Sequence, residues 1–228
     1  MKRELHEDIV DYLNYQKQLG VKYYSKSVLR APQKDSSVLA QTTNSCGLRF
    51  SELENETHNC TKCGLSRGRT TVVFGTGNRK AQLMLIGEGP GYDEDIQGKP
   101  FVGKAGMLLT KILKAINLER DEVYIGNIVK CRPPNNRTPL PDEIAACKPY
   151  IEEQISLIQP KIICALGYVA ANTLLGIESS ISKLRGKFYD YKGIKLMPTF
   201  HPAYLLRNPE KKKEVWEDVQ KIQRELNA

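Results

Sequence analysis

Four of the six cysteines have the residue type and spacing that could bind a metal. Cys60 and Cys63 form a C-x2-C pair, and Cys131 and Cys147 flank a proline-rich turn that could fold back beside it. Four thiolates at such spacing hold either a zinc ion or an iron–sulfur cluster. The spacing does not choose between these two, and on physical grounds alone zinc is slightly favoured.

A glycine-rich segment, "GEGPGYDEDIQGKPFVGKAG", follows an apolar run and spans residues 87–106. Glycines allow backbone N–H groups to approach a ligand closely, so we expect a loop that cradles a small molecule. The segment lacks the G-x-G-x-x-G spacing of a dinucleotide site and the Gly-Lys-Ser/Thr of a phosphate loop. Phe101 lies in this polar setting and is predicted to form the wall of a pocket rather than an ordinary core contact.

Two further polar residues follow apolar runs that read as strands. Asn127 closes the run "EVYIGNIV", and His201 follows "IKLMPTF". In an open parallel sheet the ligand site lies beyond the carboxyl ends of the strands. We therefore expect Asn127, His201 and the glycine-rich loop to meet in one pocket.

Alternating strand and helix patterns predict an α/β fold, namely a three-layer α/β/α domain with a central parallel sheet. Strands are expected at 71–75, 81–87, 122–129, 161–167 and 194–200. Helices are expected at 103–117, 141–158, 168–176 and 209–226.

The first fifty residues are expected to be an extension. Apolar positions between residues 5 and 19 recur with helical period, and Gly20 is a plausible end of that helix. Residues 25–46 are rich in Ser, Thr, Gln and Lys, which predicts a flexible linker. We expect residues 1–50 to form an N-terminal helix and linker, and residues 51–228 to form the compact domain. The helix is a candidate for binding a replication or repair protein.

Composition limits the function classes further. The chain has 228 residues, a formal net charge of +8 and a pI near 9.1, which indicates an anionic partner such as nucleic acid. No apolar signal segment follows Met1 and no apolar run is long enough to cross a membrane, so we expect a cytoplasmic monomer with no membrane contact. In that setting the cysteines are thiols or metal ligands rather than disulfides; Cys46 is expected to be a free thiol and Cys164 a core residue.

The motifs together resemble one known family. "CTKCGL", the glycine-rich segment, "GNIVKCRPPNNRTP" with Cys147 after it, and "TFHPAYLLRNP" occur in the order found in family 4 uracil-DNA glycosylases, the iron–sulfur type. The resemblance covers about residues 58–220. It implies a monofunctional hydrolase that flips uracil out of single- or double-stranded DNA, cleaves its N-glycosidic bond and leaves an abasic site. It also implies a structural 4Fe-4S cluster on Cys60, Cys63, Cys131 and Cys147.

The same resemblance assigns roles within the pocket. Phe101 matches the aromatic residue that stacks on uracil, and Asn127 matches the amide that reads its edge. Gly87, Glu88 and Gly89 match the loop that lines uracil and the attacking water. His201 matches the catalytic histidine that stabilises the negative charge on the leaving base.

The water-activating group is not evident, because Gly89 stands where the related family 1 enzymes carry an aspartate. Glu88, Glu94 and Asn136 are candidates for orienting water or shaping the pocket. Gly91 likewise replaces the tyrosine that excludes thymine in family 1, and Glu94 is our hypothesis for that exclusion.

Contacts with the DNA strand are expected after the histidine. Leu205 and Leu206 resemble the wedge that fills the place of the flipped base, with Arg207 near phosphate. Further cations that could contact phosphates are Lys104, Lys111, Lys130, Arg132, Arg137 and Arg185.

Two alternatives remain beside the glycosylase. One is a non-catalytic iron–sulfur DNA-binding accessory protein, against which the presence of both Asn127 and His201 argues. The other is the uracil-crosslinking type of glycosylase, whose basic insertion near the last motif is absent from "MPTFHPAY".

Overall fold

The computed structural model describes the backbone of residues 36–228 and side chains from residue 47 onward. The helix expected between residues 5 and 19, the first part of the linker and the side chain of Cys46 lie outside these described residues. The compact unit that contains the site is Cys46–Ala228.

Helix α2, Ser36–His58, replaces the second half of the expected linker. The flexible-linker prediction is therefore wrong for residues 36–46, and the expected domain boundary at residue 51 falls inside a helix. The polar composition was misleading because Phe50, Leu53 and Thr57 are buried further along the same helix. Helix formation is cooperative, so packed turns at one end favour helix in the polar turns before them.

Six strands form one sheet in the order β1-β3-β2-β4-β6-β5. They are β1 Thr76–Gly77, β2 Leu83–Gly87, β3 Tyr124–Asn127, β4 Ile162–Leu166, β5 Tyr189–Tyr191 and β6 Ile194–Thr199. The four central strands are parallel, while β1 and β5 add antiparallel edges. The predicted three-layer α/β/α fold is confirmed, with a mixed sheet in place of a wholly parallel one.

The strand expected at 71–75 is not formed. Val72, Val73 and Phe74 are buried there, and Val73 N–H donates to the Lys130 carbonyl at 2.8 Å without forming a ladder. The apolar run serves packing rather than strand pairing.

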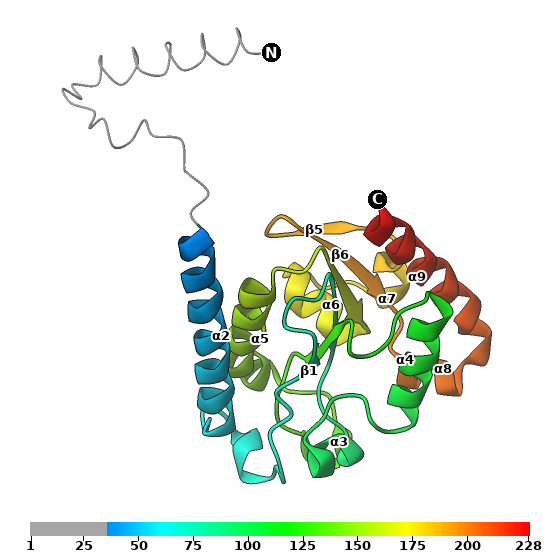
Figure 1. Ribbon diagram of the computed structural model, residues 1–228. Coiled ribbons are helices and arrows are strands. Elements are labelled where there is room, and N and C mark those ends of the chain that lie inside the picture. Colours follow the sequence, from blue (N-terminus) through cyan, green and yellow to red (C-terminus); the bar gives the residue numbers. More distant parts are fainter. Residues whose placement is uncertain (1–35) are drawn as a thin grey trace, which may run out of the picture. The chain divides into compact units, whose positions relative to one another are not determined.

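Helices cover both faces of the sheet (Figure 1). In addition to α2 they are α3 Tyr92–Gln97, α4 Lys104–Ala115, α5 Pro141–Ile158, α6 Tyr168–Leu175, α7 Ile181–Leu184, α8 Pro202–Arg207 and α9 Lys212–Asn227. Short 3₁₀ turns lie at Gly64–Arg67, Pro134–Asn136 and Pro209–Lys211. Within the described residues no helix is both long and apolar enough to cross a membrane.

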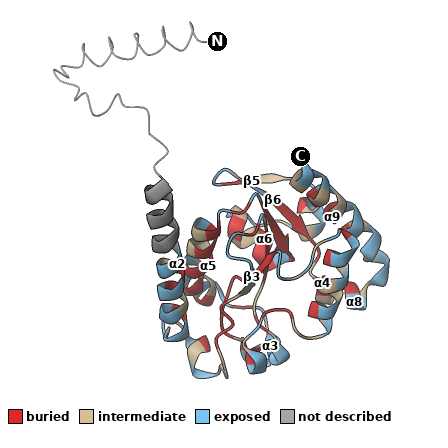
Figure 2. Ribbon diagram, viewed as in Figure 1, coloured by how far each residue is buried: buried red, intermediate tan, exposed pale blue. Residues whose placement is uncertain are grey.

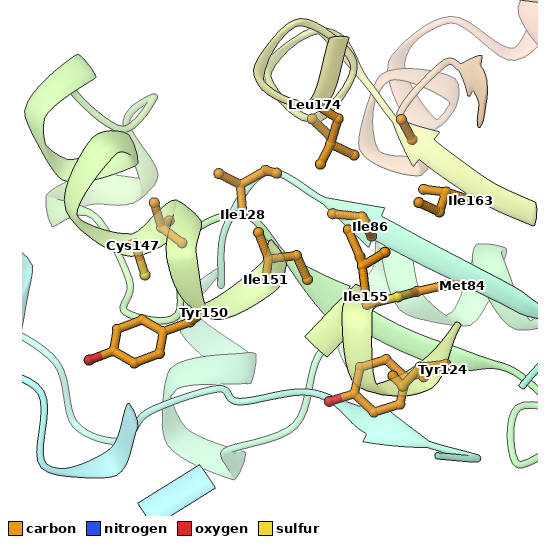
Figure 3. Close-up of a cluster of buried hydrophobic side chains, with 14 of the residues drawn as sticks. Met84, Ile86, Tyr124, Ile128, Cys147, Tyr150, Ile151, Ile155, Ile163 and Leu174 are labelled. Carbon is orange, nitrogen blue, oxygen red and sulfur yellow. The ribbon is translucent and has the colours of Figure 1, made fainter. Parts of the chain in front are cut away.

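Alternate residues of β2 serve the two layers of the core. Met84 and Ile86 pack in one cluster with Ile155 of α5, whereas Leu83 and Leu85 pack in a second cluster with helix α4. Figure 3 shows the first cluster, and Figure 2 shows that burial concentrates on the strands and on the inward sides of the helices. Strands buried on both faces explain the continuous apolar runs in the sequence.

The topology fixes where a ligand can bind. Strands β3 and β4 pair with opposite edges of β2, so the connections leaving β2 and β3 lead to opposite sides. A crevice opens at such a switch point, beyond the carboxyl ends of the parallel strands. Gly87, Asn127 and Thr199 end three of these strands, which brings the segments after them to one edge.

Candidate active site

A cavity of about 440 Å³ lies at this edge of the sheet. Three segments line it: the loop after β2 with the first turn of α4, the end of β3 with the segment after it, and His201 with α8. The lining residues are Glu88, Gly89, Pro90, Gly91, Glu94, Phe101, Ala105, Asn127, Pro133, Asn136, Arg137, His201, Ala203, Tyr204 and Arg207. The structure thus brings together most of the site residues expected from the sequence.

Asn127 is held deep in this site by strand pairing. The register between β2 and β3 places it directly beside Gly87. Its side chain is buried, and among the buried side-chain atoms that the structure describes, Asn127 Oδ1 alone has no hydrogen-bond partner. A buried acceptor without a partner costs about 1–3 kcal/mol, which a ligand N–H would recover.

Gly87 does not line the cavity itself but keeps it open. A Cβ at this position would lie 2.5 Å from Asn127 Oδ1 and 2.7 Å from Phe101 Cζ. Any side chain there would press on both the recognition amide and the aromatic wall. Glycine at residue 87 is therefore required by contact, not by an unusual backbone conformation.

Phe101 forms one wall in a conformation that L-residues rarely adopt. Its φ is 54°, in the left-handed region, which costs about 1–3 kcal/mol. Arg120 stabilises the turn by donating from Nη2 to the Pro100 carbonyl at 2.9 Å. Close packing of the turn on α4 is possible because Gly106 has no Cβ, which would lie 1.8 Å from the Phe101 carbonyl oxygen. The supporting role of Arg120 is not evident from the sequence, because Arg120 lies 20 residues after Pro100 in the chain.

Glu94 organises the same loop through its carboxylate. Oε2 accepts from the Gly91 N–H at 3.1 Å, and Oε1 accepts from the Val102 and Gly103 N–H groups at 2.9 and 3.0 Å. One side chain therefore joins the residue before α3 to the two residues that precede α4. Glu94 also lines the cavity, so it affects both loop conformation and pocket shape.

The His201 ring lies against the Phe101 ring, with centroids 5.4 Å apart and planes tilted by 31°, and both residues line the cavity. It is the N-cap of α8, and Nδ1 accepts from the Ala203 N–H at 3.1 Å. An Nδ1 that accepts leaves the proton of a neutral ring on Nε2. Burial lowers the pKa of His201 to about 4, and the Arg207 charge adds to this against the opposing charge of Glu94. The histidine is thus a neutral donor.

Like Glu94, the other two candidates for orienting water or shaping the pocket, Glu88 and Asn136, line the cavity. Burial raises the pKa of Glu88, while a hydrogen bond with Thr138 acts in the opposite direction. Asn136 has a positive φ of 55°, and its Oδ1 accepts from Arg132 Nε at 2.7 Å. The raised pKa makes Glu88 a better proton acceptor than an ordinary glutamate, whereas the Asn136 amide has no basic group.

The two leucines expected to wedge into DNA differ in exposure, since Leu205 is buried and Leu206 is exposed. Leu205 is only 1% exposed and packs with Phe200 and Val215, so its expected role in DNA contact is corrected: it anchors α8 in the core. Leu206 is 46% exposed, and Arg207 lines the cavity. The helical turn of α8 places successive residues on different faces, which the sequence pattern did not resolve.

Several expected phosphate contacts are also corrected. Lys130 is fully buried and donates to Gln154 Oε1 at 2.6 Å. Arg185 pairs with buried Asp218 at 2.6 Å, and Arg137 pairs with Glu143 at 2.7 Å. Lys104 and Lys111 remain exposed, as does Arg207. Burial and ion pairing make Lys130 and Arg185 unavailable to a phosphate, whereas Arg137 is paired but remains partly exposed in the cavity wall.

The four candidate metal-binding cysteines, Cys60, Cys63, Cys131 and Cys147, line a second, small cavity. Arg69 donates from Nη1 to Cys131 Sγ at 3.3 Å, and the Lys130 N–H donates to Cys147 Sγ at 3.2 Å. Within the described residues no group of three or more His, Cys, Asp or Glu side chains is arranged to hold a metal ion. Cys164 is buried in β4, as expected for a core residue.

Comparison with known proteins agrees with the geometry. Residues 74–220 match the uracil DNA glycosylase superfamily. The chain is 51% identical to a type-4 uracil-DNA glycosylase of Thermotoga maritima, over 71% of this chain and 86% of that protein. A type-4 enzyme of Sulfurisphaera tokodaii is 49% identical over 77% and 83%, and one of Archaeoglobus fulgidus 42% over 75% and 90%. The chain belongs to the uracil DNA glycosylase superfamily and, within it, to the type-4 uracil-DNA glycosylases.

Proposed function

We propose that this protein excises uracil from DNA by hydrolysing the N-glycosidic bond and leaves an abasic site. The observation that carries the proposal is the buried, unpartnered Asn127 Oδ1 in a cavity bounded by Phe101 and His201. A stacked base cannot reach such a cavity, so the nucleotide must flip out of the helix. The names of the type-4 relatives support the same activity.

Recognition of uracil follows from the chemistry of an amide. Asn127 Oδ1 accepts from uracil N3–H, and its Nδ2 donates to O4, while Phe101 stacks on the ring. Cytosine presents an acceptor at N3 and a donor at N4, the opposite pattern. Each mismatched buried group costs about 1–3 kcal/mol, which is enough to reject cytosine.

Departure of the base is assisted by His201. Cleavage leaves negative charge on the uracil ring, largely at O2, and a neutral Nε2–H donates a hydrogen bond to it. The Ala203 N–H holds the imidazole in this tautomer. A donor that is already oriented needs no reorganisation when the charge develops.

Water attack needs little base catalysis if the bond breaks dissociatively through an oxocarbenium-like sugar. In this proposal Glu88 and Asn136 orient the water, together with the backbone of Gly89. No lysine nucleophile lines the cavity among the described residues, which favours a monofunctional enzyme. Leu206 is the proposed wedge and Arg207 the proposed phosphate contact.

Discrimination against thymine is assigned to Glu94 and the loop that it holds. Glu94 lines the cavity, and a side chain at Gly91 would meet its carboxylate at 2.7 Å. The Glu94→Ala variant is expected to excise thymine from a T·G duplex, which the parent protein leaves intact. Unchanged discrimination in a folded variant would contradict this role.

A 4Fe-4S cluster is the proposed cofactor on Cys60, Cys63, Cys131 and Cys147. Thiolates around one zinc ion lie about 3.8 Å apart, as follows from Zn–S bonds of about 2.3 Å in a tetrahedron. The four cysteines share one cavity, which supports a common bound group, and the resemblance to the iron–sulfur type favours a cluster over one zinc ion. Arg69 and the Lys130 N–H supply hydrogen bonds to sulfur of the kind that iron–sulfur sites use. The cluster would brace loops near the DNA and take no part in hydrolysis.

The metal assignment is tested by elemental analysis of protein purified without oxygen. A brown preparation with about four iron atoms and four labile sulfides per chain supports the cluster. A colourless preparation with one zinc per chain would overturn it. If the cluster is present, replacement of Cys60 by Ser should lower both the iron and the labile sulfide measured per chain.

Further parts of this proposal concern partners. The net charge of +8 favours binding to DNA, which is a polyanion. We propose that the protein is a monomer. A replication or repair protein remains a candidate partner for the N-terminal helix, which lies outside the described residues. Deleting residues 1–50 without loss of partner binding or activity would argue against that role.

The function itself is tested by uracil release from a U·G duplex with the parent protein and His201→Ala side by side. We expect abasic sites with the parent and a rate about 100- to 1,000-fold lower with the variant, the usual effect of removing one preorganised donor. Ile96→Ala, an exposed residue of α3, is a matched control that should keep full activity. No release by a folded, metal-loaded parent protein would favour the non-catalytic accessory role.

A further inference from the structure

An exposed aromatic side chain lies beside the mouth of the cavity. Tyr92 is the first residue of α3 and is 58% exposed, although its neighbours Pro90 and Gly91 line the cavity. A large ring at this place buries little surface within the protein. Neither the pocket nor the core accounts for it.

Tyr92 is nevertheless held in a defined position. The guanidinium carbon of Arg132 lies over its ring, 5.0 Å from the centroid. Arg132 in turn donates from Nε to Asn136 Oδ1 at 2.7 Å, and Asn136 lines the cavity. The ring, the guanidinium and the pocket wall therefore form one connected surface that leads from the solvent to the uracil site.

We propose that Tyr92 and Arg132 form a stacking platform for the nucleobase adjacent to the flipped uracil. The platform is a second subsite, for an unpaired base of the same strand, and it rests on the proposed function. Aromatic rings and arginine planes bind bases of any identity, because every base has a π-face. The positive charge of Arg132 suits the polyanionic strand that enters the cavity, which favours nucleic acid over an apolar protein partner.

The platform predicts a particular kinetic signature. Stacking remote from the scissile bond is the same in the ground state and the transition state, so it lowers KM and leaves kcat unchanged. Loss of one base–aromatic stack is expected to raise KM by about five- to 150-fold, which corresponds to the usual 1–3 kcal/mol. Inhibition by free uracil should not change, since uracil alone does not reach the platform.

The test is a double-mutant cycle between protein and substrate. Single-stranded oligonucleotides carry uracil with normal neighbours, or with an abasic spacer in place of the 5′ or the 3′ neighbour. We expect the spacer on one side to raise KM for the parent protein and to have less than a twofold effect on Tyr92→Ala. Tyr92→Phe should behave as the parent, and Ile96→Ala, on the same helix, serves as the control for surface changes.

Each outcome has a distinct meaning. If the parent is insensitive to both spacers, or if the variant keeps the parent's sensitivity, the platform is refuted while the glycosylase function stands. A change in the inhibition constant of free uracil would also refute it, because the effect would then lie in the pocket. If no protein releases uracil from any oligonucleotide, the proposed function fails instead.

Discussion

We predict that the carboxylate of Glu94 stabilises the conformation of the glycine-rich loop that lines the cavity. The Glu94→Gln variant tests this with almost no change in size. Glutamine keeps one acceptor oxygen, which can still receive the Val102 and Gly103 N–H groups, but as neutral hydrogen bonds. Its NH₂ group then faces the Gly91 N–H, a donor against a donor, so that bond is lost.

The magnitude follows from the three hydrogen bonds. Bonds to a charged group are worth about 1.5–3 kcal/mol each, and neutral ones about 0.5–1.5 kcal/mol. Weakening two bonds and losing the third gives about 2–4 kcal/mol after allowance for the partial exposure of Glu94. The same hydrogen bonds stabilise the strained backbone of Phe101, whose φ is 54°, so weakening them also destabilises that conformation.

Hydrogen exchange measures the effect where it arises. The amides of Gly91, Val102 and Gly103 should exchange about 30- to 900-fold faster in Glu94→Gln, the rate ratio that 2–4 kcal/mol of local stability implies. The inhibition constant of free uracil should rise in parallel, because Phe101 is no longer fixed. Asp93→Asn, a charge change in the same turn of α3, is the control. Amides that stay protected within threefold of the parent would refute the reasoning.

Three further predictions concern the cavity and α8. Gly87→Ala should lower kcat/KM for uracil by about five- to 150-fold, because a Cβ 2.5 Å from Asn127 Oδ1 overpacks the site by about 1–3 kcal/mol; activity within twofold of the parent would contradict this. The pKa of His201 is about 6.5 in the unfolded chain and about 4 in the folded protein, so the unfolded chain binds the proton first as the pH falls. The free energy of unfolding should therefore decrease between pH 6.5 and pH 4. Denaturant titrations should show a smaller decrease over this range in His201→Gln. Leu205→Ala should cost about 2–5 kcal/mol of unfolding free energy with a reduced midpoint in urea. Leu206→Ala should leave stability within about 0.5 kcal/mol yet slow excision from duplex DNA, and equal stability losses in both variants would contradict the division of α8.

The sheet and the position of the site were predictable because both follow from periodicity. Apolar runs at 81–87, 161–167 and 194–200 each contain a parallel strand, and the polar residues after them meet at one edge. The run at 71–75 has the same composition but lies where no neighbouring strand is available. Burial can be predicted from apolar composition, whereas pairing depends on partners distant in the sequence.

The partners of charged residues could not be predicted in the same way. Lys130 and Arg185 look like surface cations in the sequence, yet one is buried against Gln154 and the other is paired with Asp218. Arg120 shows the reverse case, because an unremarkable cation supports the turn before Phe101. Such roles depend on contacts between residues far apart along the chain, which spacing does not encode.

Two features of the site are energetically costly and need support from the residues around them. An unpartnered Asn127 Oδ1 and a left-handed Phe101 each destabilise the folded protein by about 1–3 kcal/mol. Glu94 and Arg120 offset this with hydrogen bonds to the backbone on either side of Phe101. In the proposed function uracil N3–H donates to Asn127 Oδ1, so only a base with the correct edge recovers the free energy lost at this acceptor. On that proposal, specificity is built into the fold before DNA binds, and the glycine-rich loop holds the residues that provide it.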